Sequence, residues 1–211
     1  MLQDRMNVFL DLDNTIINAL EEDEREKVPL DIQKRFDYKD MLGYGIRVFG
    51  RPHLQDFLDF LFDNFNVSVF TAAEQEYALF IVNNFLLTKP DRKVNYVLFR
   101  YHVDMGLTRY NAMKDMRLLW HVFKLPNVHP CNTVIIDDLK DVKEANPENT
   151  IRIDAFDVVK KQEVNLPSLY DTELLRVKSI LTELNTRYKN SGCARSIYLG
   201  RTPTCKSPFE L

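Results

Sequence analysis

The sequence predicts an α/β fold in which helices cover both faces of a central parallel sheet. Short apolar runs, each the length of one strand, alternate along the chain with longer segments whose apolar residues recur at helical spacing. β-branched and aromatic residues dominate the short runs, as is usual in strands. Such alternation favours parallel pairing, because each helix returns the chain to the same edge of the sheet.

Five apolar runs are the strand candidates, and residues of functional type follow most of them. The runs are residues 8–10, 67–70, 96–99, 134–136 and 150–153. The first four end in Asp11, Thr71, Arg100 and the pair Asp137-Asp138. Ligands of open α/β sheets bind outside the carboxyl ends of the strands. We therefore expect these side chains to meet at one edge of the sheet.

Helical periodicity marks four further segments, which are residues 52–62, 74–87, 111–124 and 170–187. Each segment gathers its apolar residues on one face, as expected of a helix that covers a sheet. Pro52 suits the first turn of its helix, where a backbone N–H has no intrahelical partner. Lys114 is expected in the first turn or so of the helix after the third strand.

Residues 19–50 interrupt the alternation and predict a small hairpin-type insertion after the first strand. The stretch begins with the acidic run Glu21 to Glu26 and passes Gly43-Tyr44-Gly45 before a strand candidate at 46–49. We expect one domain over residues 1–187. Residues 188–211 are rich in Ser, Gly, Pro and Arg and show little periodicity, which is typical of a flexible tail.

Composition excludes several classes of protein. The 211 residues are 45% hydrophobic and 28% charged, with a formal net charge of -3, so no global basic field favours direct nucleic-acid binding. No apolar run approaches the roughly 20 residues that span a bilayer. Three widely spaced cysteines lack zinc-site spacing and do not predict a disulfide framework. With no signal peptide after Met1, we expect a soluble intracellular protein, nuclear or cytoplasmic, of undetermined oligomeric state.

The strongest chemical motif is Asp11-Leu12-Asp13-Asn14-Thr15, directly after the first strand. Two carboxylates separated by one residue can divide the work of phosphoryl transfer. Asp11 would attack phosphorus as a nucleophile. Asp13 would protonate the leaving oxygen and then activate water. The alternative is a turn at the strand end in which Asp13 or Asn14 caps a helix.

Three other positions complete a possible phosphate and metal site. The Thr71 hydroxyl can hold a phosphate oxygen, although Thr71 with Glu74 three residues on also suits a helix N-cap. Lys114 can neutralise a phosphoryl group, although an isolated lysine is usually solvated. Asp137 and Asp138 repel each other unless a cation lies near, and carboxylates are ligands that Mg²⁺ prefers. Their alternative is a loop that caps the next helix.

In this order, the motifs resemble those of the haloacid-dehalogenase superfamily. The chain is most similar to its branch of RNA polymerase II C-terminal-domain phosphatases, the small C-terminal-domain phosphatases or NLI-interacting-factor-like proteins. The resemblance covers roughly residues 5–187 and includes the segments Gly50–Leu58, Val69–Ala73, Leu98–Arg100, Asn111–Met116 and Tyr170–Leu175, with Tyr77 six residues beyond Thr71.

The resemblance implies a Rossmann-like, three-layer fold and a set of roles. Asp11 would be the nucleophile and Asp13 the acid/base, and Thr71 and Lys114 would bind phosphate. Mg²⁺ would be held by Asp11, the Asp13 main-chain carbonyl and Asp138, while Tyr77 and Arg100 would contact a peptide. The chain departs from the usual family pattern at Asn14, at Glu74 and in the pair Asp137-Asp138, where the family has Glu, an apolar residue and Asp-Asn.

The first functional hypothesis is a magnesium-dependent phosphatase acting through an aspartyl-phosphate. Its partner would be a phosphoserine or phosphothreonine protein or peptide, with the RNA polymerase II C-terminal domain as a candidate substrate, and no membrane is expected. A second hypothesis is a phosphatase of another substrate class, such as a small phosphoester or a nucleic-acid terminus. A third is a non-catalytic module that binds a phosphorylated partner.

Overall fold

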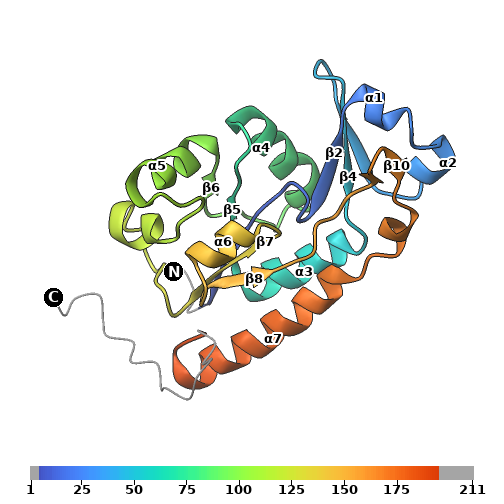
Figure 1. The fold of residues 1–211 in the computed structure, drawn as a ribbon. Coiled ribbons are helices and arrows are strands. Elements are labelled where there is room, and N and C mark those ends of the chain that lie inside the picture. Colours follow the sequence, from blue (N-terminus) through green and yellow to red (C-terminus); the bar gives the residue numbers. More distant parts are fainter. Residues whose placement is uncertain (1–4, 195–211) are drawn as a thin grey trace.

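The structure is a computed structural model that describes residues 5–194 of the 211-residue chain. Its centre is a five-stranded parallel sheet with the order β6-β5-β1-β7-β8 (Figure 1), which confirms the predicted fold class. The strands are β1 (Asn7–Leu10), β5 (Asn66–Phe70), β6 (Val97–Leu98), β7 (Thr133–Asp137) and β8 (Thr150–Arg152). All five strand predictions are confirmed, and their ends differ by at most one residue from those expected.

Helices cover both faces of this sheet. Successive strand residues point to opposite sides, so each face carries its own set of side chains for the helices to bury. In β1, Val8 and Leu10 join a large core with side chains of α3 (Leu54–Asn64), α4 (Gln75–Ile81) and α7 (Glu173–Ser191). Phe9 joins a second core on the other face, with α5 (Arg100–Tyr110) and α6 (Lys140–Ala145). The result is the three-layer arrangement that the resemblance implied.

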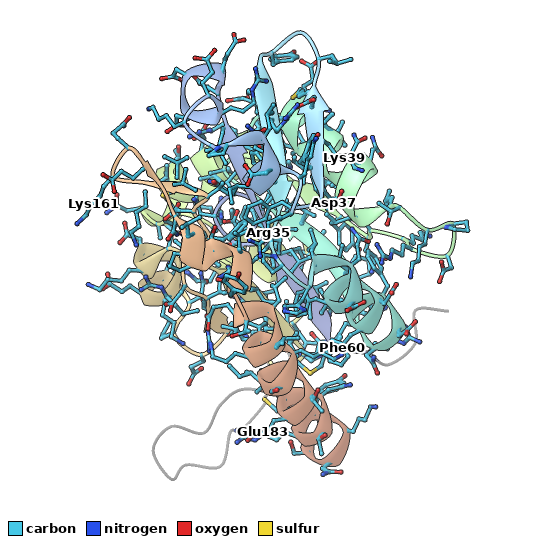
Figure 2. The ribbon with its side chains drawn as sticks, turned by 90° about the vertical axis from the view of Figure 1, so that its right-hand side faces the viewer. Arg35, Asp37, Lys39, Phe60, Lys161 and Glu183 are labelled. Carbon is cyan, nitrogen blue, oxygen red and sulfur yellow. The ribbon has the colours of Figure 1, made fainter. Side chains whose placement is uncertain are left out.

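The helices α3 and α7 run beside each other under the sheet (Figure 1). Both bury apolar side chains in the large core, including Phe57 and Leu58 of α3 and Leu181 of α7. At their outer seam, Phe60 of α3, labelled in Figure 2, lies with its ring centroid 5.2 Å from the ammonium of Lys178 on α7. Each fully buried apolar side chain of the large core, such as Phe57, stabilises the fold by about 1.5–3 kcal/mol.

The insertion is larger than the hairpin expected from the sequence. It holds β2 (Ile17–Leu20), α1 (Glu22–Arg25), α2 (Leu30–Gln33), β3 (Tyr38–Met41) and β4 (Ile46–Gly50), and the three strands pair antiparallel in the order β2-β4-β3. Only β3 and β4 form a hairpin. The insertion has a core of its own, to which Phe36, Phe49 and Phe156 contribute. The predicted strand at 46–49 is confirmed as β4.

Two helix predictions need correction. The 74–87 segment begins as α4 and ends in a π-helical turn, Val82–Leu86. The 111–124 segment is not one helix. Helix α5 ends instead at Tyr110 and is capped by Asn111, which has a left-handed φ of 53°, and a turn leads to a second π-helical segment at Leu118–Val122. Lys114 lies in that turn, with a φ of 46°, rather than on a helix.

Towards the C-terminus, β9 (Val159–Lys160) and β10 (Glu163–Val164) pair antiparallel, and a 3-10 helix at Leu166–Tyr170 leads into α7. Helix α7 confirms the 170–187 prediction and continues to Ser191. Residues 195–211 of the predicted tail lie outside the described residues.

Two sequence-wide expectations can be compared with residues 5–194. In this part of the chain, no helix has the length and apolar character needed to cross a bilayer. The cysteines differ from what was expected, because Cys131 is disulfide-bonded; Cys193 is buried.

Candidate functional site

The predicted site residues gather around one pocket at the carboxyl edge of the sheet. The pocket has a volume of about 260 Å³ and is lined by Asp11, Asp13, Asn14, Thr71, Ala72, Ala73, Arg100, Lys114, Asp138 and Leu139. Two other predicted residues, Tyr77 and Asp137, stand behind this lining and hydrogen-bond to Asp13 and Lys114. Parallel topology explains the convergence, because β1, β5 and β7 end at the same edge.

A buried ammonium group lies at the centre of the site. Lys114 Nζ is 2.6 Å from Asp11 Oδ1 and 2.7 Å from Asp137 Oδ2. The three residues are at most 4% exposed, so the alternative of a solvated lysine is wrong. Burial lowers the pKa of Lys114, but the charges of Asp11 and Asp137 outweigh burial and raise it. Lys114 therefore carries its charge directly beside the predicted nucleophile.

The turn that holds Lys114 is fixed by Asn146, which ends α6. The Asn146 side-chain amide donates to the Lys114 carbonyl at 3.1 Å, and its oxygen accepts the Met116 N–H at 2.9 Å. Because Asn146 is buried, losing either bond would leave a polar group unsatisfied. The Lys114 ammonium is thus positioned by a turn whose backbone is hydrogen-bonded to Asn146 at the end of α6.

The adjacent acids Asp137 and Asp138 have different surroundings. Both carboxylate oxygens of Asp137 have partners, since Oδ2 accepts from Lys114 and Oδ1 accepts the Leu139 N–H at 2.8 Å. Burial, reinforced by the charge of Asp11, raises the pKa of Asp137 to about 7 despite these bonds. Asp138 is only partly buried, lines the pocket and accepts from the Thr15 hydroxyl at 3.2 Å. Burial also raises the pKa of Asp138.

The donor set fits a hard divalent cation. Carboxylate oxygens of Asp11, Asp137 and Asp138 lie within 4.8 Å of one another. With Asp13, four carboxyl groups surround one buried ammonium, so an additional cation would reduce their repulsion. Mg²⁺ prefers such oxygen ligands and is usually held by one or two carboxylates. Asp11 and Asp138 line the pocket and Asp137 does not, so Asp11 and Asp138 are the carboxylates better placed to ligate it.

Asp13 is held by a side chain of α4. The Tyr77 hydroxyl of α4 donates to Asp13 Oδ1 at 2.6 Å. Burial raises the pKa of Asp13 to about 6, with the charge of Asp11 adding to it and the Tyr77 hydrogen bond opposing it. The alternative of a helix cap at Asp13 or Asn14 is wrong, because the chain turns into β2 and no helix follows.

The turn after Asp13 depends on Asn14, which has a left-handed φ of 56°. Its side-chain amide donates to the Phe156 carbonyl at 3.2 Å and to Asp157 Oδ1 at 2.6 Å, and its carbonyl accepts the Phe156 N–H at 2.7 Å. Asparagine tolerates this backbone conformation better than most residues do. The departure from the usual family residue at this position is therefore stabilised by the loop that follows β8.

Thr71 and Arg100 line the pocket opposite the acids. Thr71 Oγ1 accepts the Ala73 N–H at 3.1 Å, and α4 has Glu74 as its N-cap, so the expectation that Thr71 caps this helix is wrong. Arg100 is the first residue of α5 rather than the end of a strand, and its side chain is 48% exposed. Its Nε lies 3.7 Å from Glu74 Oε1 at the rim.

Sequence reasoning missed the role of Arg51. Its guanidinium is buried and donates twice to Asp171, from Nε to Oδ1 and from Nη2 to Oδ2, at 2.8 Å each. Nη1 donates to the Thr15 carbonyl at 2.8 Å. Arg51 therefore ties the motif after β1 to the start of α7. The Arg-Pro pair before α3 was its only signal, and that pair reads equally well as a helix start.

A larger open cavity of about 530 Å³ lies on the insertion, away from this site. Its lining is Glu21, Glu22, Asp23, Glu26, Tyr44 and Gly45. It contains neither the nucleophile nor a lysine, so the chemistry belongs to the smaller pocket.

Comparison with known proteins identifies the family of the chain. The model of the NLI interacting factor-like phosphatase family matches residues 6–191. The CTD phosphatase-like protein 355R of Invertebrate iridescent virus 6 is 42% identical over 183 residues, which cover 83% of this chain and 96% of the viral protein. Its counterpart in Invertebrate iridescent virus 3 is 36% identical over 185 residues, 82% of this chain and 94% of that protein.

Among solved structures, Fcp1, an essential RNA polymerase II CTD phosphatase, superimposes with a TM-score of 0.63 at 20% identity. The match covers 90% of this chain and 64% of the Fcp1 chain, so this chain spans less than two thirds of its length. At that identity the similarity concerns the fold alone.

Proposed function

Because the chain belongs to the NLI interacting factor-like phosphatases and has the haloacid-dehalogenase fold, we propose that it is a magnesium-dependent protein phosphatase. Membership of this family identifies the chain as a phosphatase. The finer proposal is that it hydrolyses phosphoserine and phosphothreonine monoesters through an aspartyl-phosphate on Asp11. One observation carries this proposal, which is the Lys114 ammonium 2.6 Å from the Asp11 carboxylate at the floor of the pocket.

In the first step, an Asp11 carboxylate oxygen attacks phosphorus and forms an acyl phosphate, while the ester P–O bond breaks. Asp13 gives its proton to the departing serine or threonine oxygen. Lys114 stabilises the negative charge that develops on the transferring group, because its ammonium is fixed before reaction and needs no reorganisation. Thr71 and Arg100 face the same pocket and orient the phosphate oxygens.

In the second step, the Asp13 carboxylate accepts a proton from water as that water attacks phosphorus. The bond between phosphorus and Asp11 breaks, which releases inorganic phosphate and restores the Asp11 carboxylate. Asp13 thereby regains the proton that it donated in the first step, so the cycle is balanced. Asp13 lines the pocket and can reach the leaving oxygen and then the water that replaces it.

Asp11, the Asp13 main-chain carbonyl and Asp138 would hold Mg²⁺, which when bound neutralises phosphate charge and orients it for attack. Asp137, a metal ligand by the sequence prediction, serves instead to hold Lys114, since it accepts from the Lys114 ammonium and does not line the pocket. This division leaves Asp138, which lines the pocket, as the acid of the pair that ligates the metal.

A phosphorylated protein or peptide is the substrate class that best suits the pocket. Three strands and two short helices form the whole insertion, so no large domain encloses a small metabolite in residues 5–194. The RNA polymerase II C-terminal domain is a candidate, because the two viral relatives described above are named for CTD phosphatases.

Phosphate release from an aryl phosphate, with and without Mg²⁺, tests the proposal. We expect magnesium-dependent release from the wild type and its loss in Asp11→Asn. Asp63→Asn is the matched control, because Asp63 is exposed near the end of α3 and away from the pocket lining. Asp11→Asn turnover at the wild-type rate would reject the nucleophile, and turnover in excess chelator would reject the metal. Phosphoserine, phosphothreonine and phosphotyrosine peptides then test the substrate class.

A further inference from the structure

The hydroxyl of Tyr77 is placed to control the predicted general acid. It donates to Asp13 Oδ1 at 2.6 Å. Within residues 5–194, Tyr77 is the only side chain that hydrogen-bonds to the Asp13 carboxyl, whereas Asp11 and Asp138 also contact the Thr15 hydroxyl. The orientation of the Asp13 carboxyl therefore depends on one contact from another element.

Tyr77 and Asp13 belong to different elements of the fold. Tyr77 belongs to α4, where its neighbours Ala78 and Ile81 are buried, and its ring packs against the large core. Asp13 belongs to the turn between β1 and β2 and lines the pocket, which Tyr77 does not. The phenol thus reaches Asp13 from behind the pocket wall. This placement distinguishes Tyr77 from a residue whose main task is to touch the substrate.

We propose that Tyr77 is a positioning residue that fixes the Asp13 carboxyl, with Oδ1 on the phenol and Oδ2 directed to the leaving oxygen. The inference rests on the proposed function, because it assigns Asp13 the transfer of a proton. With Oδ1 engaged as an acceptor, the transferable proton resides on Oδ2, the oxygen free to face the pocket. Without the phenol, the carboxyl can rotate and present that proton less often in a reactive geometry.

The dependence of kcat/KM on the leaving group is a readout that a purely structural role of Tyr77 would not change. Protonation matters most when the departing oxygen is a strong base and least when it is a stable phenolate. We would measure kcat/KM for a series of substituted phenyl phosphates of similar size, since this parameter includes every step through departure of the leaving group. Tyr77→Phe removes one oxygen and keeps the ring that packs against the core.

We expect Tyr77→Phe to lower kcat/KM at least about 10-fold for phenyl phosphate, a part of the 10²–10⁴ range of general acid catalysis, and at most about 3-fold for p-nitrophenyl phosphate. The plot of log kcat/KM against leaving-group pKa should become steeper. Tyr44→Phe is the matched control. The Tyr44 hydroxyl also bonds α4, donating to Glu76 Oε2 at 2.5 Å, but it does not contact Asp13. Its plot should match that of the wild type.

The alternatives predict different plots. An equal loss of kcat/KM for every leaving group would overturn the inference and assign Tyr77 to substrate contact or to the fold. An unchanged plot would overturn it as well. A wild type that releases no phosphate from any member of the series would reject the proposed function itself, and the inference with it. Wild-type activity that is lost in Asp11→Asn, together with an unchanged Tyr77→Phe slope, would retain the function and reject only the role of Tyr77.

Discussion

Lys114→Met removes the ammonium between Asp11 and Asp137 and keeps most of the length of the side chain. The change leaves two buried carboxylates, 4% and 0% exposed, without the cation that contacts both. Removing one partner of a buried ion pair costs about 3–5 kcal/mol of stability. Here the affected groups are almost completely buried, so solvent screening does not reduce that range appreciably.

Protonation of Asp137 sets a ceiling on the loss. Its pKa is already raised to about 7 with Lys114 present, and it rises further when the ammonium is removed. The wild type already bears most of the cost of neutralising this carboxyl at pH 7, because its Asp137 pKa is raised from 3.8 to about 7. Such a group is protonated when folded and ionised when unfolded, so unfolding releases a proton. Both the variant and the wild type should therefore gain stability as the pH falls from 7 towards 5.

Urea unfolding in chelator at pH 7 and pH 5.5 measures this loss without a metal contribution. We expect Lys114→Met to be about 3–4 kcal/mol less stable than the wild type at pH 7, and both proteins to gain stability at pH 5.5, so that their difference changes by less than about 1 kcal/mol. Lys140→Met is the control, because Lys140 is 74% exposed and its pair with Glu144 is screened by solvent, so the change should leave stability nearly unaltered. A loss below about 1 kcal/mol at pH 7 would contradict the buried charge arrangement.

Two further predictions concern the supports of the site. Arg51→Met should destabilise the fold by about 3–5 kcal/mol in urea unfolding, because it leaves Asp171 and the Thr15 carbonyl without their donor. Arg187→Met, at an exposed pair on α7, should change stability by at most about 0.5 kcal/mol, and equal effects would contradict the anchor role. Asn14→Ala should be less stable than Asn14→Gly by about 1 kcal/mol, since both lose the side-chain bonds but only alanine is strained at a φ of 56°. Equal stability of these two variants would show that the backbone relaxes.

The sequence was most informative where strand topology alone determines position. Asp11 and Thr71 directly follow β1 and β5, and the pair Asp137-Asp138 lies at the end of β7; parallel pairing brings those strand ends to one edge. Apolar composition was sufficient to locate the strands, because a buried strand needs little else. The convergence of these residues was thus predictable without knowledge of any loop.

The position of Lys114 was not predictable in the same way. The apolar spacing of residues 111–124 is real, and Met116 and Leu119 are buried in the second core, but they reach it from a turn and a π-helical segment. Periodicity reports which side chains are buried, not where a helix begins. The close approach of α5 to this turn depends on Gly106, whose added Cβ would lie 3.0 Å from the Ala112 carbonyl oxygen. Such a tertiary constraint leaves no local pattern.

The acids Asp137 and Asp138 show how a correct physical premise can produce an incomplete assignment. Their mutual repulsion does require a cation, but consecutive residues of a strand point in opposite directions. Asp137, the last residue of β7, meets Lys114, whereas Asp138 meets Thr15 and the pocket. The two carboxylates therefore face different partners, a lysine for one and, in our proposal, Mg²⁺ for the other. An amide at position 138 would keep the Asp137–Lys114 pair but remove a metal-binding charge, so the extra carboxylate of this chain should strengthen metal binding rather than disturb the nucleophile.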